Sequence, residues 1–349
     1  MVSSSVLVTA LKAAAEPTRL RILALLAAGE LSVKDLTRIL GQSQPRLSRH
    51  LKLLVEAGLV ERAPEGSWVY FRLPTQLKAS AKASTKDAAN TLAHDLLRDL
   101  DAADPVLVRD RQRLATVKHE RETAAQDYFR THAGNWDRMR ALHIAEADVE
   151  AAMRSALGDA PVDLLVDVGT GTGRILELFG GHFARGLGFD LNTAMLAYAR
   201  QKLDHSGVAH AQVRQGDIYD LPLADGAAGA VVMHQVLHYL SDPARAISEA
   251  ARLLAPGGKL LIVDFAPHAL EFLRETHRHE RLGFETATVS QWLADAGLQV
   301  VATRALAPAG KRTDDQLTVS LWLAECAVTI VPARPKSKSS TKPALERTA

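Results

Sequence analysis

Four short apolar runs follow one another after Pro161, and a stretch with helical spacing comes after each of them. The runs cover residues 162–169, 184–191, 226–236 and 257–265. Strands that alternate with helices pair in parallel, and helices then cover both faces of the sheet, so each strand is apolar along its length. The pattern therefore predicts a doubly wound α/β sheet, which the late segments 298–307 and 316–327 would complete with an antiparallel last strand.

A different pattern occupies the first 75 residues, which read as short helices followed by two strands. Pro17 and Gly29 mark the beginning and end of one helix. Ser32, with Asp35 three residues later, predicts a capping box at the start of the next helix, and Gly41 predicts its end. These signals indicate a small, separate helical domain.

The helix predicted from Gln44 to Gly58 follows directly, so the two helices form a helix-turn-helix. In this motif the second helix enters the major groove, where Arg recognises guanine and Gln recognises adenine. Alternating segments around a Pro64–Gly66 turn would form a wing. Spacing alone also leaves open a plain helical bundle with a solvated polar face. The predicted DNA contacts are Ser43, Gln44, Arg46, Ser48, Arg49, His50 and Lys52 on the helix, and Arg62 and Trp68 on the wing.

Residues 5–75 resemble the winged helix of the ArsR family of bacterial regulators, most specifically in QPRLSRHLKLLVEAGLV. The resemblance implies a dimeric repressor that binds an inverted repeat in double-stranded DNA, with its two recognition helices ~34–36 Å apart. Many family members sense metals through cysteines on the helix that here reads LSVKDL. Leu31, Ser32 and Val33 occupy those positions, and Cys326 is the chain's one cysteine. We therefore expect no metal site.

Charge is distributed unevenly, although the net charge is only +2. Residues 1–75 contain 10 Lys and Arg against 6 Asp and Glu, whereas residues 160–330 contain 14 against 19. The first segment could meet a polyanion that the second would repel. The predicted parts are a DNA-binding domain at 1–75, a helical linker or dimerisation region at 76–123, an α/β domain at 124–332 and a disordered basic tail at 333–349.

Within the linker, Leu92, Leu96 and Leu100 recur four residues apart and predict a helix with one apolar stripe. Pro105 would end that helix. No apolar run approaches the ~18 residues that cross a bilayer, and the N-terminus lacks a basic stretch before a long apolar one. We therefore expect a cytoplasmic protein without a membrane partner.

The stretch LLVDVGTGTGR predicts a strand that ends at Val168 and a helix that begins near Gly173. Its three glycines let the backbone turn tightly and let a ligand approach. Asp190, about 20 residues further on, can accept hydrogen bonds from both ribose hydroxyls. Asp217, after a third strand, can accept one from an adenine amino group. A glycine-rich turn alone is weak evidence, but the three elements together indicate a nucleoside-binding site.

These elements resemble the class I S-adenosylmethionine-dependent methyltransferases over about residues 124–330, most of all the ubiquinone and menaquinone C-methyltransferases. ARLLAPGGKLLIVDF matches the fifth-strand signature, and HQVLHYLSDP matches the segment after the fourth strand. The resemblance implies a Rossmann-like fold and S-adenosylmethionine or S-adenosylhomocysteine as the ligand. The implied cofactor-binding residues are Asp167, Gly169, Thr170, Gly171, Gly173, Asp190, Leu191, Asp217, Ile218, His234 and Gln235.

Catalytic residues are not fixed by the sequence, because methyl transfer depends largely on positioning. If the acceptor is a hydroxyl or an activated carbon, a general base would help. Tyr128 and Trp136 could cover the sulfonium, since aromatic faces attract cations. The candidate bases are His234, His238 and Asp264, with His268, His277 and His279 as further possibilities.

Two functions follow from these patterns. The first is an ArsR-type transcriptional regulator, a repressor and homodimer, whose methyltransferase-fold domain senses S-adenosylmethionine or S-adenosylhomocysteine. The second is an active small-molecule methyltransferase that regulates its own operon. An intact cofactor motif is compatible with both.

Overall fold

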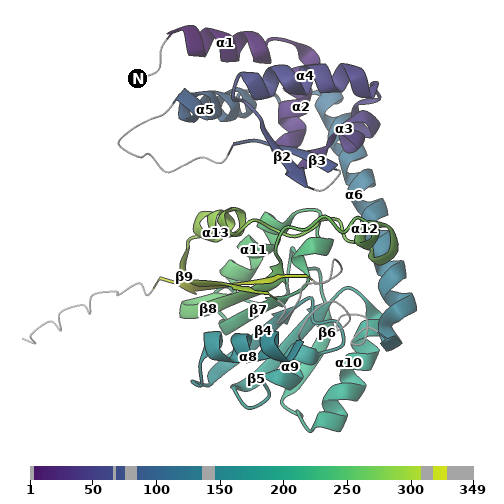
Figure 1. Cartoon of the computed structure of the whole chain (residues 1–349), viewed down its shortest axis with the longest axis vertical. Helices are drawn as coiled ribbons and strands as arrows, with labels where there is room; N and C mark the ends of the chain where they lie inside the picture. The colour runs from purple at the N-terminus through teal and green to yellow at the C-terminus, as the bar shows by residue number, and fades with distance from the viewer. Residues whose placement is uncertain (1–3, 66–67, 75–84, 136–145, 308–316, 328–349) are drawn as a thin grey trace, which may run out of the picture.

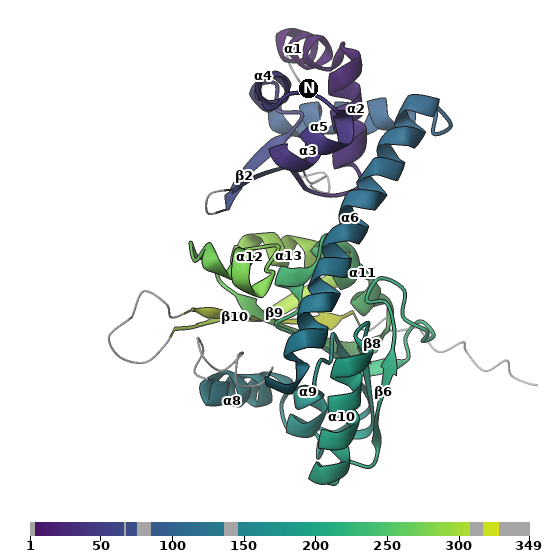
Figure 2. The ribbon, with the colours of Figure 1, turned by 90° about the vertical axis from the view of Figure 1, so that its right-hand side faces the viewer.

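The computed structural model describes residues 4–65, 68–74, 85–135, 146–307 and 317–327. It has two lobes connected by one long helix, α6 (Pro105–His132) (Figure 1). The N-terminal lobe comprises the described residues up to 98, and the C-terminal lobe comprises those from 146 onward. Helix α6 begins beside the first lobe and runs along the side of the second (Figure 2).

The N-terminal lobe combines helices with a small sheet. Its elements are α1 (Ser4–Ala14), α2 (Pro17–Leu26), β1 (Leu31–Ser32), α3 (Val33–Leu40), α4 (Gln44–Glu56), β2 (Glu61–Glu65), β3 (Trp68–Arg72) and α5 (Thr85–Arg98). The predicted capping box is present at the start of α3, where Ser32 and Asp35 each accept from the other's backbone N–H. Gly41 ends α3 in a left-handed conformation. The predicted hairpin forms, and β1 adds a third strand in the order β1-β3-β2.

Pro105 begins a helix instead of ending one, contrary to the prediction. Helix α5 ends at Arg98, so Leu100 lies outside it. Pro105 occupies the first turn of α6, where its missing N–H leaves no hydrogen bond unmade, and Asp104 caps the helix by accepting a 2.7 Å bond from the N–H two residues on. Helix α6 therefore crosses the predicted boundary between linker and α/β domain. The predicted tail, 333–349, lies outside the described residues.

The C-terminal lobe is built on a seven-stranded sheet in the order β6-β5-β4-β7-β8-β10-β9. The strands are β4 (Val162–Val168), β5 (Phe183–Asp190), β6 (Ala211–Gln215), β7 (Ala228–His234), β8 (Leu254–Phe265), β9 (Leu298–Leu306) and β10 (Val319–Cys326). Strand β10 is antiparallel to both of its neighbours, whereas the pairs from β6 to β8 are parallel. The predicted doubly wound sheet with an antiparallel last strand is confirmed.

Helices cover both faces of this sheet, as the apolar strands require. The helices of this lobe are α8 (Glu146–Leu157), α9 (Arg174–Leu178), α10 (Thr193–Ser206), α11 (Pro243–Arg252), α12 (Phe272–His277) and α13 (Thr286–Asp295), with short turns η1 (Ala133–Asn135) and η2 (Leu237–Tyr239). Helices α8, α9 and α10 contribute to one apolar core and α11 and α13 to the other. The carboxyl ends of the parallel strands remain open between these layers, and the site lies there.

Helix α6 is 28 residues long and packs on both lobes. Its Leu114 and Val117 are buried in the core of the N-terminal lobe. Arg21 of α2 donates two hydrogen bonds, of 2.6 and 2.7 Å, to the buried carboxylate of Asp110 on α6. Neither α6 nor any other helix in the described part of the chain is long and apolar enough to cross a membrane.

Candidate cofactor pocket and DNA-binding surface

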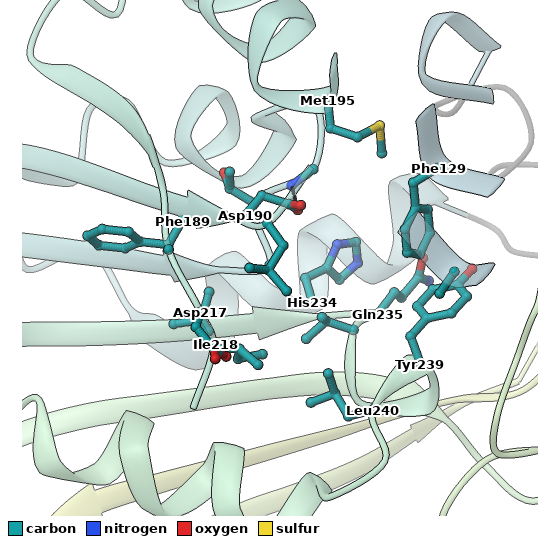
Figure 3. A pocket seen from close by; sticks show the side chains of 18 of the residues that line it. Phe129, Phe189, Asp190, Met195, Asp217, Ile218, His234, Gln235, Tyr239 and Leu240 are labelled. Atoms are coloured by element: carbon teal, nitrogen blue, oxygen red, sulfur yellow. Dashed lines mark hydrogen bonds between the residues drawn. The ribbon is translucent and has the colours of Figure 1, made fainter. Parts of the chain in front are cut away.

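A pocket opens where strands β4, β5, β6 and β7 end (Figure 3). Parallel strands leave such a crevice at their carboxyl edge, where the connections diverge to opposite faces. The predicted residues that line the pocket are Gly169, Thr170, Gly171, Asp190, Leu191, Asp217, Ile218, His234 and Gln235. Sequence reasoning therefore placed most of one wall of this pocket.

Two further predicted residues, Asp167 and Gly173, do not line the pocket and instead support the conformation of the glycine turn. Asp167 is buried and accepts a 2.5 Å hydrogen bond from the Thr170 hydroxyl. Gly173 is the N-cap of α9, with φ of 78°. Gly169 has φ of 74°, and a Cβ there would lie 2.5 Å from the side chain of Val236. The turn therefore requires glycine at residue 169 for both its backbone conformation and its packing.

Asp190 is fixed by the turn that it faces. Its Oδ2 accepts a 2.9 Å hydrogen bond from the N–H of Gly171, and its Oδ1 accepts a 2.8 Å bond from the N–H of Asn192. Burial raises the pKa of Asp190 above its usual value, despite these backbone hydrogen bonds. The carboxylate thus has a defined position, and each oxygen retains a lone pair for a further donor.

Asp217 and Ile218 lie on the side of the pocket next to β6. Asp217 is exposed, and its Oδ1 accepts a 2.9 Å hydrogen bond from the N–H of Tyr219. Ile218 is buried, and Phe189 and Leu191 complete an apolar slot beside it. A flat heterocycle with an amino group fits such a slot.

The opposite side of the pocket comes from α6, which no motif indicated, and from Tyr239, which lies in the segment HQVLHYLSDP. Ala125, Gln126 and Phe129 of α6 line it together with Tyr239 of η2. The Phe129 and Tyr239 rings meet edge to face at a centroid distance of 4.7 Å, and Figure 3 shows them side by side. Spacing within α6 could have indicated that one of its faces is buried, but not that this face belongs to a pocket.

The predicted aromatic cover differs by one residue from the one observed. Tyr128 does not line the pocket. Its hydroxyl lies 2.7 Å from Nδ1 of His277, and burial raises its pKa to about 12. Phe129, the next residue, provides the aromatic face instead. Trp136 lies outside the described residues.

His238 and Asp264 form a buried pair next to the pocket. Nδ1 of His238 lies 2.8 Å from Oδ1 of Asp264, and the side chains are 2% and 0% exposed. Asp264 also accepts from the N–H groups of His238 and Phe265. A carboxylate at Nδ1 orients an imidazole and leaves Nε2 as its basic atom. The ring of Tyr239, 4.1 Å from that of His238, belongs to the pocket wall.

Two other candidate histidines pack beyond this pair, outside the pocket lining. The ring of His279 lies 4.2 Å from that of His238. Burial lowers the pKa of His268 to about 4 and that of His279 well below its usual value. Both imidazoles are therefore neutral near pH 7. Among the described residues, no group of three or more His, Cys, Asp or Glu side chains is arranged to hold a metal ion.

The predicted DNA-binding face lies mainly on α4. Leu47, Leu51 and Leu54 of this helix are buried in the N-terminal lobe. His50 is packed against the start of α2, with its side chain 12% exposed and its Nδ1 3.6 Å from Glu16. The side chain of Trp68 lies outside the described part. The predicted contacts with exposed side chains are Ser43, Gln44, Arg46, Ser48, Arg49, Lys52 and Arg62.

A glycine turn at the carboxyl edge of this sheet, with an acidic residue at the end of the second strand, defines a Rossmann-like methyltransferase fold. Residues 166–262 match a family model described as methyltransferase domain. Residues 16–62 match one described as bacterial regulatory protein, arsR family. The chain belongs to the methyltransferase domain family, and an ArsR-type helix-turn-helix is fused to that domain.

Individual relatives match one lobe or the other. The arsenical resistance operon repressor of Escherichia coli is 49% identical over 71 residues, which are 20% of this chain and 61% of the repressor. The phosphatidylethanolamine N-methyltransferase of Cereibacter sphaeroides is 30% identical over 153 residues, 42% of this chain and 75% of that enzyme. A solved SAM-dependent methyltransferase from Aquifex aeolicus aligns with a TM-score of 0.41 and 21% identity, over 51% of this chain and 89% of the other.

The chain spans only part of the curated relatives that it matches, from 34% of a protein of Streptomyces fradiae to 75% of the Cereibacter enzyme. The methyltransferase fold implies S-adenosylmethionine as ligand, and the pocket residues fit it. Asp190 contributes a carboxylate with an unused lone pair on each oxygen, Ile218 an apolar side chain and Gly171 its backbone to the pocket lining.

Proposed function

We propose that this protein is a DNA-binding transcriptional regulator whose C-terminal lobe senses S-adenosylmethionine or S-adenosylhomocysteine. The observation that carries the proposal is the position of α6. Leu114 and Val117 anchor this helix in the DNA-binding lobe, and Phe129 of the same helix lines the pocket. A ligand that contacts Phe129 therefore touches a helix whose other end is packed in the DNA-binding lobe.

On the DNA side, the exposed polar face of α4 is the proposed recognition surface. Arg46 and Arg49 can each donate two hydrogen bonds to guanine, and Gln44 can recognise adenine. Lys52, also exposed, lies further along the helix, where phosphate is the expected partner. As a cytoplasmic homodimer, the protein would present two such helices to an inverted repeat and act as a repressor.

On the ligand side, Asp190 would accept the ribose hydroxyls, and Asp217 with Ile218 would hold the adenine. The methionine part of the ligand would lie against the glycine turn and against His234 and Gln235, which stand at the end of β7. S-adenosylmethionine carries a methyl group on a positively charged sulfonium, and that methyl carbon is electrophilic. The aromatic faces of Phe129 and Tyr239 would distinguish this cation from the uncharged thioether.

Fluorescence anisotropy on the DNA upstream of the protein's own gene tests this proposal. DNA affinity is measured at fixed salt without ligand, then with saturating S-adenosylmethionine, then with S-adenosylhomocysteine. A change of about 5–150-fold with either ligand supports the sensor. Tight DNA binding that neither ligand alters, when calorimetry shows both to be bound, overturns it.

The second candidate function is an active methyltransferase, which the His238–Asp264 pair favours. His238 does not line the pocket, but its ring lies 4.1 Å from that of Tyr239, which does. An acceptor hydroxyl that reaches past Tyr239 could give its proton to Nε2 of His238, with Asp264 stabilising the charge that forms. Transfer of labelled methyl from S-adenosylmethionine to candidate acceptors tests it. A product whose rate falls about 100-fold or more in His238→Gln, with ligand affinity unchanged, would favour the enzyme.

A further inference from the structure

We propose that Arg121, held between Glu280 and Asp35, transmits the state of the pocket to the first helix of the helix-turn-helix. This inference rests on the proposed sensor function and names the contact through which the regulation passes. It is carried by hydrogen bonds that connect three segments far apart in the sequence.

Arg121 lies on α6 and bridges the two lobes. Its Nη1 donates a 2.7 Å hydrogen bond to Oε1 of Glu280, and its Nη2 donates to Oδ1 of Asp35. The Asp35 and Glu280 side chains are only 4% and 10% exposed. Buried carboxylates require charged partners, so neither lobe can move away from Arg121 without leaving a buried charge unpaired.

On the DNA-binding side, the bridge ends in the capping box of α3. The Oδ2 atom of Asp35 accepts from the N–H and the hydroxyl of Ser32, at 3.0 and 2.7 Å. The same carboxylate thus fixes the start of α3 and binds Arg121. Because α3 packs on the recognition helix α4, a displacement of Asp35 changes how α4 is presented.

On the pocket side, the bridge ends in the turn that forms the pocket wall. The second oxygen of Glu280, Oε2, accepts a 3.0 Å hydrogen bond from Ser241, which lines the pocket. The N–H groups of Glu280 and Arg281 both donate to the carbonyl of His238, at 2.9 and 3.0 Å. The segment 238–241 therefore contacts both the ligand site and Glu280.

The helix provides a second connection between Arg121 and the pocket. Ala125 and Phe129 line the pocket, and they follow Arg121 at four and eight residues. Residues at this spacing share one face of a helix. A ligand that moves Phe129 or Tyr239 therefore displaces α6 and the 238–241 turn. Arg121 lies on α6 and reaches that turn through Glu280.

Neighbouring contacts make the bridge part of a closed, charge-matched cluster. Glu30 of the DNA-binding lobe accepts from Arg281 at 2.6 Å and from Arg72 at 3.2 Å. The Arg281 guanidinium lies 4.0 Å from the ring centroid of Tyr70, whose hydroxyl donates to the carbonyl of Glu280. These contacts hold the residue 280–281 turn on the hairpin, so the cluster rearranges as a unit.

Amide hydrogen exchange on the full-length protein tests the link without DNA. Exchange in α3 is compared with and without S-adenosylhomocysteine, after calorimetry has shown binding. One variant is Arg121→Met, which removes both ion pairs. The other is Ser241→Ala, which removes the hydrogen bond at the pocket end, leaves both ion pairs in place and so remains informative if Arg121→Met does not fold; its ligand binding is checked by the same calorimetry. The matched control is Glu120→Gln, which removes the ion pair between Arg38 of α3 and Glu120 of α6, both of them exposed.

We expect the ligand to change α3 exchange several-fold in the wild type and in Glu120→Gln, and less than about 2-fold in Ser241→Ala and Arg121→Met. The link is overturned if the ligand changes α3 exchange equally in all four proteins. It is also overturned if bound ligand leaves α3 exchange unchanged in the wild type. The DNA titration is scored separately. If α3 responds to ligand but DNA affinity does not change, the sensor proposal fails while the link stands.

Discussion

The carboxylate of Asp190 accepts a 2.9 Å hydrogen bond from the backbone N–H of Gly171, across 19 residues of sequence. The bond joins the end of β5 to the glycine turn after β4. The glycine turn and the acidic residue, which lie apart in the sequence, therefore form one site, and a change at either residue alters the position of the other.

Asp190→Asn should weaken binding of S-adenosylhomocysteine by about 10–100-fold, because an amide has one acceptor oxygen for two backbone donors and a ribose. Calorimetry measures the loss. Asp204→Asn, on an exposed carboxylate of α10, is the control and should bind as the wild type does. Since burial raises the pKa of Asp190, affinity should also begin to fall with acidification above the ordinary range for Asp. Equal binding by both variants would remove Asp190 from the site.

Gly169→Ala should abolish ligand binding and destabilise the C-terminal lobe by more than Gly207→Ala does. Both glycines have positive φ, 74° and 71°, so both substitutions carry the same backbone penalty of about 1 kcal/mol. Only at Gly169 does the new Cβ collide with Val236, at 2.5 Å, whereas nothing lies within 4 Å at Gly207. Urea denaturation and calorimetry on both variants measure the difference. Similar losses in the two would show that the turn tolerates a side chain.

Replacing Arg46 and Arg49 together by Ala should weaken binding to operator DNA by about 10–100-fold and reduce the salt dependence of binding. Both side chains are exposed, so stability should change little. Arg154→Ala, at an exposed arginine on α8, controls for lost charge. Anisotropy at several salt concentrations provides both quantities. An unchanged affinity and salt slope in the double variant would show that α4 does not read DNA.

Acidification should destabilise the C-terminal lobe between about pH 6.5 and pH 4. Burial lowers the pKa of His268 from 6.5 to about 4, so over this interval the unfolded chain binds a proton that the folded chain does not. The free energy of unfolding then falls by about 1.4 kcal/mol per pH unit for each such group, and it is flat above pH 6.5. His279 shifts in the same direction. Urea midpoints across this range should fall less steeply in His268→Gln than in His119→Gln, which alters an exposed histidine; identical slopes would contradict the assignment.

Sequence patterns predicted one wall of the pocket and not the other, for a physical reason. Gly169, Gly171 and Asp190 lie at the ends of consecutive strands, whose positions follow from apolar runs and turn glycines. Phe129 reaches the pocket because α6 crosses between the lobes, and no local sequence pattern predicts that path. The end of α5 was predicted at Pro105 and lies at Arg98, because a proline can either end one helix or begin another.

The sequence by itself determined the elements whose stability comes from neighbours in the chain. The Ser32–Asp35 capping box, the left-handed turn at Gly41 and the alternation of strands and helices depend on short-range hydrogen bonds and on hydrophobic periodicity. Only the tertiary structure decided which elements meet. Arg121 binds Asp35 and Glu280 from 86 and 159 residues away, and those pairs exist because α6 packs on both lobes where the two lobes also contact each other directly.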